Sequence, residues 1–180
     1  AHKLDSWSID AFASPHVPPL AKLGITLSVN AAVCLPQPRR RIRFLPSICT
    51  DVVCVHLVPG FSDMALQHGM DPSLRGLVLS AYGCGNLPAR KSTLIAMLSK
   101  AVAAGVVVVM VTQTLRGLAN LSTYETGRAL LAIGVVSGVD MTVECAAVKL
   151  GWLLGQGLPT VDVRRLMRTN LRGELAEDGA

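Results

Sequence analysis

The chain has 180 residues, of which 51% are hydrophobic and 16% are charged. This balance suits one packed domain and excludes global disorder. The longest apolar run, residues 106–111, is far shorter than the ~20 residues that cross a bilayer, so no membrane partner is expected. The first residues are polar and do not form a signal peptide, and an initiator Met is absent, so we expect a cytoplasmic fragment or processed product.

The five cysteines form no C-x-x-C pair, and their odd number favours reduced thiols in the cytosol. Their irregular spacing and the scattered histidines predict no metal site, and no cofactor is expected. The net charge of +5 comes largely from the run of arginines at residues 39–43. Because only Phe44 is available to stack on a base beside this run, a solvated loop is favoured over a nucleic-acid contact.

Three regions follow one another along the chain. Residues 1–30 are predicted to be a linker, broken by several prolines, with an exposed strand at 23–29. Residues 31–50 show no periodicity and are expected to form an irregular loop. Residues 51–180 are expected to form one α/β domain.

Apolar segments and helical periodicities alternate within this domain. The patterns predict strands at 51–58, 77–82 and 106–112, and helices at 63–70, 91–104, 127–133, 141–156 and 161–170. Asp140 and Thr142 are candidate N-caps for the fourth helix. With right-handed crossovers, this order gives a small parallel sheet with helices on both faces.

Two of the buried strands end in polar loops. The first segment reads GLVLSAYGCGNLP at 76–88, and the second reads GVVVVMVTQTLRG at 105–117. The carboxyl edge of an open α/β sheet is where small molecules bind, so Asn86, Thr112 and Thr114 are candidate ligand contacts. The threonine hydroxyls could equally satisfy local backbone groups, and the glycines at 83 and 85 could serve a turn.

No nucleophile with a neighbouring base is recognisable in the chain. Cys84 has no base beside it, and His56 lies in a predicted strand, where a structural role is favoured. The motif of a serine hydrolase, G-x-S-x-G, is absent. A nucleotide-binding domain is disfavoured because Pro88 stands where a G-x-G-x-x-G loop has its third glycine.

Several of these segments occur in the same order in one known family. They are KLDSWSIDAFASP at 3–15, LSAYGCGNLP at 79–88, VTQTLRG at 111–117, TYETGRALLAIGVVSGVDMTVECAAVKLGWLLGQ at 123–156 and NLRGEL at 170–175. Together they resemble the C-terminal domain of the cytoplasmic-type (type I) L-asparaginases. Residues 31–50 match poorly. The resemblance implies a hydrolase that converts asparagine and water to aspartate and ammonia.

The resemblance also implies which residues serve as sites. The family's nucleophilic threonine lies in a TGGTI-like motif that this sequence lacks, together with the Thr-Asp pair and the lysine. Residues 1–30 would then be a strap from a missing N-terminal domain, and the chain alone would be inactive, with no catalytic residue of its own. Asn86 corresponds to a residue that reaches an active site, often that of a neighbouring subunit, so a homo-oligomer is expected.

In some type I members the same edge binds a regulatory asparagine, which makes asparagine the expected small-molecule partner. Asn86 and Thr112 fit that pattern, whereas Ser80 stands in place of an arginine and Thr114 in place of a cysteine. The missing arginine removes the natural partner of a substrate carboxylate and weakens the case for regulation. The alternative function is a non-catalytic module, derived from an asparaginase, that binds a small ligand or dimerises.

Overall fold

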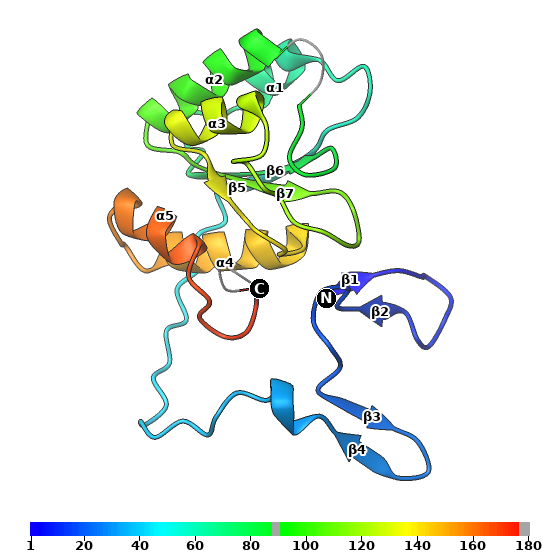
Figure 1. The fold of residues 1–180 in the computed structure, drawn as a ribbon. Helices are drawn as coiled ribbons and strands as arrows, with labels where there is room; N and C mark the ends of the chain where they lie inside the picture. The colour runs from blue at the N-terminus through cyan, green and yellow to red at the C-terminus, as the bar shows by residue number, and fades with distance from the viewer. Residues whose placement is uncertain (88–90, 177–180) are drawn as a thin grey trace.

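The computed structural model describes residues 1–87 and 91–176. A four-stranded parallel sheet lies at the centre, in the order β5, β6, β7, β8 (Figure 1). These strands span Val52–His56, Gly76–Ala81, Val107–Thr112 and Val136–Ser137. Every residue of the inner strands β6 and β7 is buried, which explains why both are apolar except for Ser80 and Thr112 near their ends.

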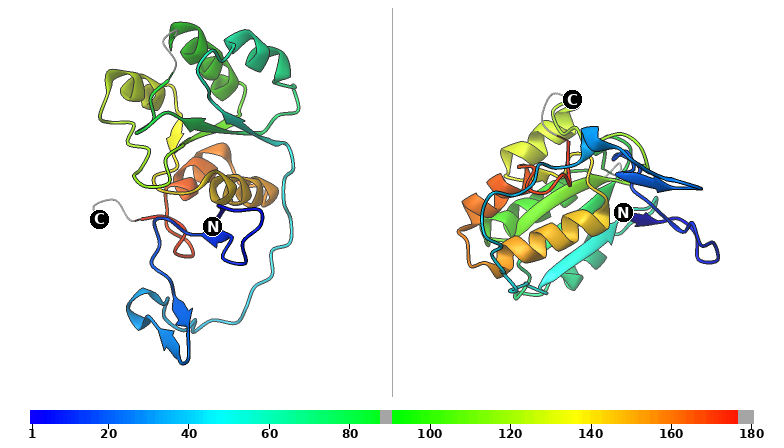
Figure 2. Two further views of the ribbon diagram at one scale, coloured as in Figure 1. Left: turned by 90° about the vertical axis from the view of Figure 1, so that its right-hand side faces the viewer. Right: turned by 90° about the horizontal axis from the view of Figure 1, so that it is seen from below.

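Helices cover both faces of this sheet. α1 (Asp63–Gly69), α2 (Lys91–Ala103) and α3 (Glu125–Ala132) lie on one face, and α4 (Val143–Gly155) and α5 (Thr160–Met167) on the other (Figures 1 and 2). Alternate side chains of the strands therefore enter two separate cores. Leu77 and Leu79 pack toward α1–α3, whereas Val78 packs toward α4 and α5.

The expected small parallel sheet with helices on both faces is confirmed, and its three apolar strands lie where the sequence predicts them. Thr142 is the N-cap of α4, and its hydroxyl accepts a hydrogen bond from the Cys145 N–H at 3.3 Å. β8 is not foreseen by the sequence pattern, because two residues show no periodicity. It forms by pairing with β7.

The single strand expected at residues 23–29 is wrong. Two short strands, β3 (Ala21–Leu23) and β4 (Leu27–Val29), pair there as an antiparallel hairpin. Gly24 begins the turn, and its N–H donates to the Thr26 carbonyl at 3.2 Å. The alternation of apolar and polar residues therefore continues through a reversal of the chain.

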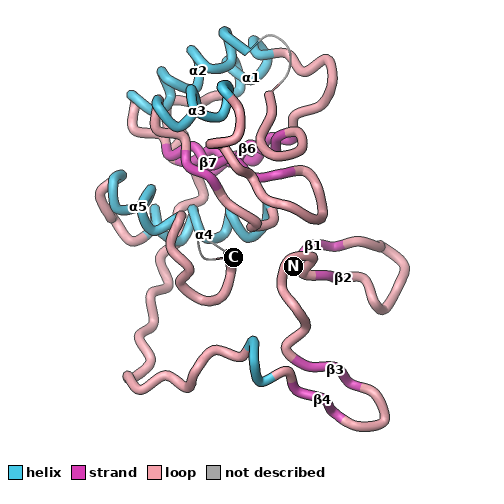
Figure 3. The backbone as a smooth tube through the Cα atoms, viewed as in Figure 1, coloured by secondary structure: helices cyan, strands magenta, loops and turns pink. Residues whose placement is uncertain are grey.

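Residues 1–50, called here the N-terminal segment, extend away from the α/β domain (Figure 3). They contain only short elements: the β1–β2 pair (His2–Lys3 with Phe12–Ala13), the β3–β4 hairpin and the 3₁₀ turn η1 (Ala31–Val33). Most of their large apolar side chains are exposed, including Trp7, Ile9, Leu23, Ile25, Ile42 and Phe44. The segment thus has no core of its own.

The last part of this segment returns to the domain along α4. The Trp152 indole N–H donates to the Leu45 carbonyl at 3.1 Å, and the Cys49 N–H donates to the Gly151 carbonyl at 2.9 Å. A Cβ at Gly155 would lie 2.6 Å from the Ser47 carbonyl oxygen, so this close approach requires glycine. These contacts hold residues 45–49 against α4, directly before β5 begins.

Candidate functional site

The carboxyl ends of β6 and β7 lie side by side, because Ala81 pairs with Thr112 in the parallel register. A small cavity of about 140 Å³ opens at this edge of the sheet. Ser80, Thr112 and Thr114 all line it, so the structure brings together three of the four residues that the sequence singles out. The cavity is also bounded by the start of α4 and by the N-terminal segment.

The two threonine hydroxyls are engaged within the protein. The Thr112 hydroxyl donates to the Gly83 carbonyl at 2.6 Å and lies 2.8 Å from the Thr114 hydroxyl. The Thr114 hydroxyl donates to the Arg116 carbonyl at 2.8 Å, and the Thr114 N–H donates to the Thr112 oxygen at 3.0 Å. Both hydroxyl protons are therefore donated to carbonyl oxygens of the protein. The threonine oxygens can offer a ligand mainly their acceptor lone pairs.

Ser80 is only 4% exposed and lies on β6 facing this cavity. Beside it, the Gln113 amide donates to the carbonyls of Leu57 and Ser80. These bonds join the ends of β5, β6 and β7, and the Ser80 carbonyl also accepts a hydrogen bond from the Leu57 N–H at 3.0 Å. Gln113 therefore acts as a structural brace of this edge, and the short Ser80 side chain leaves the cavity its space.

Asn86 lies apart from this cavity. The loop after β6 turns back, because the Asn86 N–H donates to the Tyr82 carbonyl at 2.8 Å and the Tyr82 N–H donates to the Asn86 carbonyl at 3.1 Å. Gly85 holds φ at +108° and packs on Leu121, where a Cβ would lie 2.9 Å from a side-chain carbon. The Asn86 side chain is exposed and makes no hydrogen bond to the part of the chain that the structure describes. Pro88, the residue that marks the helix entrance in the sequence, lies outside the described residues.

Three histidines line the cavity; the sequence favours a structural role for His56 and does not single out the other two. His2 and His16 belong to the N-terminal segment, and His56 ends β5. Nothing in the local sequence marks the first two, since folding alone brings them to the sheet edge. Among the described residues, no group of three or more His, Cys, Asp or Glu side chains could hold a metal ion.

One of these histidines contacts a carboxylate at the rim. The His2 Nδ1 atom lies 2.6 Å from a carboxylate oxygen of Glu144 in the first turn of α4. Burial tends to raise the pKa of the Glu144 carboxyl, but its own N–H, the Thr142 hydroxyl and His2 together lower that pKa below its ordinary value. Glu144 is therefore a carboxylate at neutral pH and anchors the β1–β2 pair to the domain.

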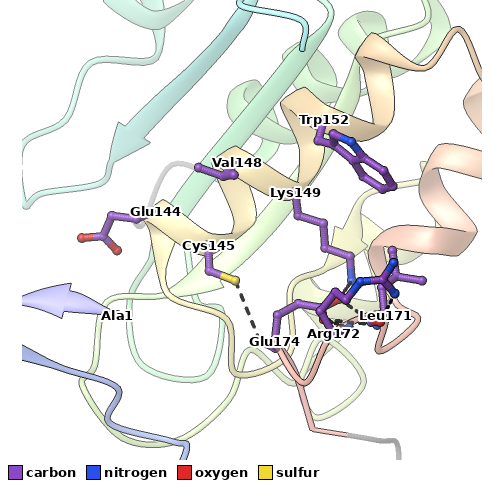
Figure 4. A pocket seen from close by; sticks show the side chains of 9 residues that line it. All are labelled: Ala1, Glu144, Cys145, Val148, Lys149, Trp152, Leu171, Arg172 and Glu174. Atoms are coloured by element: carbon purple, nitrogen blue, oxygen red, sulfur yellow. Dashed lines mark hydrogen bonds and ion pairs between the residues drawn. The ribbon is translucent and has the colours of Figure 1, made fainter. Parts of the chain in front are cut away.

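A larger cavity of about 580 Å³ lies on the outer face of α4, near the C-terminal segment (Figure 4). Its central feature is the Lys149–Glu174 ion pair, with N and O 2.6 Å apart and both side chains largely buried. The Lys149 ammonium also donates to the carbonyls of Met167 and Thr169, at 3.2 and 2.7 Å. These bonds fix α4 to the end of α5.

The same carboxylate organises the chain after α5. Glu174 accepts hydrogen bonds from the backbone N–H groups of Leu171 and Arg172. Burial tends to raise the pKa of the Glu174 carboxyl, but Lys149 and these N–H groups lower it below its ordinary value. Cys145 donates to the Glu174 carbonyl, and burial raises the pKa of its thiol (Figure 4). The arrangement suits a structural clamp better than a reactive centre.

Comparison with known proteins shows the family to which this chain is related. The family model of the Glutaminase/Asparaginase C-terminal domain matches residues 51–167. The chain belongs to that family. L-asparaginase 1 of Escherichia coli (strain K12) is 38% identical over 169 residues, which cover 94% of this chain and 50% of the relative. The 60 kDa lysophospholipase of Mus musculus is 35% identical over 175 residues, 96% of this chain and 31% of the relative.

Solved structures agree with the sequence comparison. The crystal structure of L-asparaginase I from Vibrio cholerae superposes with a TM-score of 0.85 at 35% identity, covering 92% of this chain and 50% of that chain. The chain therefore spans about half the length of those bacterial relatives. In its described residues, no helix has the length and hydropathy needed to cross a membrane.

Proposed function

We propose that this chain is the C-terminal half of an amidohydrolase that converts L-asparagine and water to L-aspartate and ammonia. The observation that carries the proposal is the family match over residues 51–167, joined to a chain that spans half of an L-asparaginase. The sequence contains no TGGTI-like motif. Acyl transfer from an amide needs a nucleophile and its activating groups in one place, so the chain requires an N-terminal catalytic domain as partner.

Within that enzyme, Asn86 is assigned to the active site. Its amide is exposed just beyond the carboxyl end of a buried strand and is free to donate and accept toward another domain or subunit. A shared active site of this kind implies a homo-oligomer. The likeness to cytoplasmic-type enzymes and the free state of its five cysteines support a location in the cytoplasm.

The cavity at the sheet edge is assigned to a small effector. Its threonine oxygens accept hydrogen bonds, which suits the ammonium group of an amino acid, and His2, His16 and His56 supply ring nitrogens. Ser80 provides no cation for a carboxylate, unlike the arginine of the resembling enzymes. Asparagine would therefore bind weakly here, and a neutral polar amide is the better fit.

The decisive experiment measures ammonia release from asparagine by the purified 180-residue chain and by the chain joined to an N-terminal asparaginase domain. We expect no release above blank from the chain alone and turnover from the joined protein. Steady turnover by the chain alone, abolished by a substitution within it, would overturn the assignment. The joined protein with its nucleophilic threonine replaced by alanine is the control for contaminating activity.

A non-catalytic ligand-binding module is the second candidate. It is favoured by one observation, which is that Ser80, Thr112 and Thr114 all line one 140 Å³ cavity at the carboxyl edge of the sheet. Calorimetry of the isolated chain with asparagine and with glutamine tests it. Binding without any turnover in the joined protein would favour the module over the enzyme.

A further inference from the structure

A third cavity lies at the opposite edge of the sheet, between the turn that follows α3 and the last turn of α5. Its volume is about 690 Å³. The turn at Gly134 leads into β8, so this is the amino edge of that strand and is distinct from the carboxyl edge described above. Three arginines line the cavity, Arg164, Arg165 and Arg168, and none of the lining residues that the structure describes is acidic.

Arg164 is held in this cavity by packing. Its Nε atom is buried and has no hydrogen-bond partner among the described residues. The guanidinium lies against Gly134, where a Cβ would come within 3.4 Å of its Nη1 atom. Gly134 also has φ at +93°, a conformation that favours glycine. A buried donor without a partner is costly, so the site holds a cation with unmet hydrogen-bonding capacity.

Within residues 1–87 and 91–176, no neighbouring acidic side chain is paired with Arg164. Asp162 is paired with Arg165, at 3.1 Å between the guanidinium and the carboxylate. Arg164 and Arg168 are four positions apart, a spacing at which like charges on a helix repel one another. The helix end would normally stabilise such cations, but Lys149 already binds the carbonyls of Met167 and Thr169 there.

We propose that this cavity binds a phosphate-type anion, either inorganic phosphate or the phosphate group of a small metabolite. Arginine guanidinium groups match phosphate oxygens with paired hydrogen bonds. A phosphate offers three or four acceptor oxygens and up to two negative charges, enough for several arginines, whereas a carboxylate offers two oxygens and one charge. Binding at this edge is independent of the proposed amidohydrolase activity.

The test is isothermal titration calorimetry of the 180-residue chain at pH 7 and constant ionic strength. The probes are inorganic phosphate, glycerol 3-phosphate, acetate and a single-stranded RNA oligonucleotide. The variant Arg164→Gln/Arg168→Gln removes two cavity cations. The control Arg39→Gln/Arg41→Gln removes the same charge from the exposed N-terminal segment. Arg168→Gln alone, at an exposed position, is the safeguard if Arg164→Gln impairs folding.

We expect saturable binding of phosphate or glycerol 3-phosphate, weakened about tenfold or more in the cavity variant and changed less than about twofold in the control. Tighter binding of glycerol 3-phosphate than of phosphate identifies a phosphorylated metabolite, and the reverse identifies the free ion. Equal losses in both variants would show a general charge effect and overturn the site. Binding of acetate or RNA without binding of either phosphate probe would also overturn it.

Discussion

The α/β domain and the N-terminal segment of this chain contain similar apolar residues but use them in opposite ways. In the domain, Leu77, Leu79 and Val109 are fully buried. In the N-terminal segment, Trp7 is 95% exposed and Ile42 is 98% exposed. The domain therefore stabilises itself, whereas strands of two or three residues are too short to hold a hairpin alone. The segment's apolar side chains are suited to contacts with another body.

The largest contrast should come from replacing a lysine with methionine in each region. Lys149→Met leaves the largely buried Glu174 carboxylate without its partner, and we expect a loss of about 3–5 kcal/mol in the free energy of unfolding. Lys3→Met removes only a solvent-exposed contact with the Phe12 ring, 5.5 Å away, and should cost less than about 1 kcal/mol. Urea denaturation of both variants measures the difference. Equal losses in the free energy of unfolding would show that the Lys149–Glu174 ion pair stabilises the fold no more than the exposed contact does.

The same comparison of the two regions can be made with two leucines, which carry no charge. Leu79 is fully buried between strands and helices, whereas Leu23 is 87% exposed in the β3–β4 hairpin. Leu79→Ala should cost about 2–5 kcal/mol, from lost burial and a residual cavity. Leu23→Ala should stay within about 0.5 kcal/mol. If Leu23→Ala in the isolated chain proves as costly as Leu79→Ala, the N-terminal segment packs in solution more tightly than the structure indicates.

Acid should weaken both the Lys149–Glu174 ion pair and the His2–Glu144 contact, which anchors the N-terminal segment. The pKa values of Glu174 and Glu144 are lowered in the folded state, so each carboxylate stabilises the fold above its unfolded pKa of about 4.3. That stability is lost as the pH falls through the lower folded values. The melting temperature should therefore decline below about pH 4, and less steeply in Glu174→Gln. If the melting temperature of Glu174→Gln falls with pH as steeply as that of the wild type, Glu174 does not contribute to the acid sensitivity.

The exposed apolar residues predict self-association or dye binding by the isolated chain. Contiguous apolar surface beyond a few hundred Å² is unusual for a monomer. Trp7→Ser and Phe12→Ser should lower the fluorescence of a hydrophobic dye, whereas Val148→Ser on α4, also exposed, serves as the control outside the segment. Sedimentation velocity gives the oligomeric state. A strictly monomeric chain without dye binding would contradict the prediction.

The smallest stability effect is expected at Asn86. Its side chain is exposed and makes no hydrogen bond to the described residues, so Asn86→Ala should change the free energy of unfolding by less than about 0.5 kcal/mol. In the protein joined to an N-terminal domain, the same change should lower kcat/KM about ten- to hundredfold, as expected for a lost hydrogen bond to a charged group. A lower melting temperature with unchanged kinetics would show that the loop, and not the substrate, needs Asn86.

The contrast between the regions also explains what the sequence can predict. β6 and β7 are buried on both faces, and a short, nearly continuous apolar run followed by polar residues is typical of such strands. Ser80, Thr112 and Thr114 meet at one cavity because adjacent parallel strands end at the same edge. Their position in the sequence was therefore sufficient to predict their proximity.

Other parts of the site depend on contacts between distant segments. Asn86 leaves the cavity because the chain doubles back onto Tyr82, a reversal that the motif alone does not specify. His2 and His16 reach the sheet edge from the N-terminal segment, whose residues have no periodic pattern relating them to it. The arginines at the end of α5 form a cavity only with the turn at Gly134, which lies 30 positions before Arg164.

The glycines of α4 have a mechanical consequence. Gly151 and Gly155 lie one turn apart and let residues 47–49 rest directly on the helix backbone, where added methyl groups would come within 2.9 and 2.6 Å of carbonyl oxygens. A displacement of the N-terminal segment is therefore transmitted to α4, through Trp152 and Gly151, before it reaches β5. α4 is therefore the first element of the domain to bear a force that is applied through residues 45–49. Movements of the first residues of that segment would instead reach the sheet-edge cavity directly, because His2 and His16 line it.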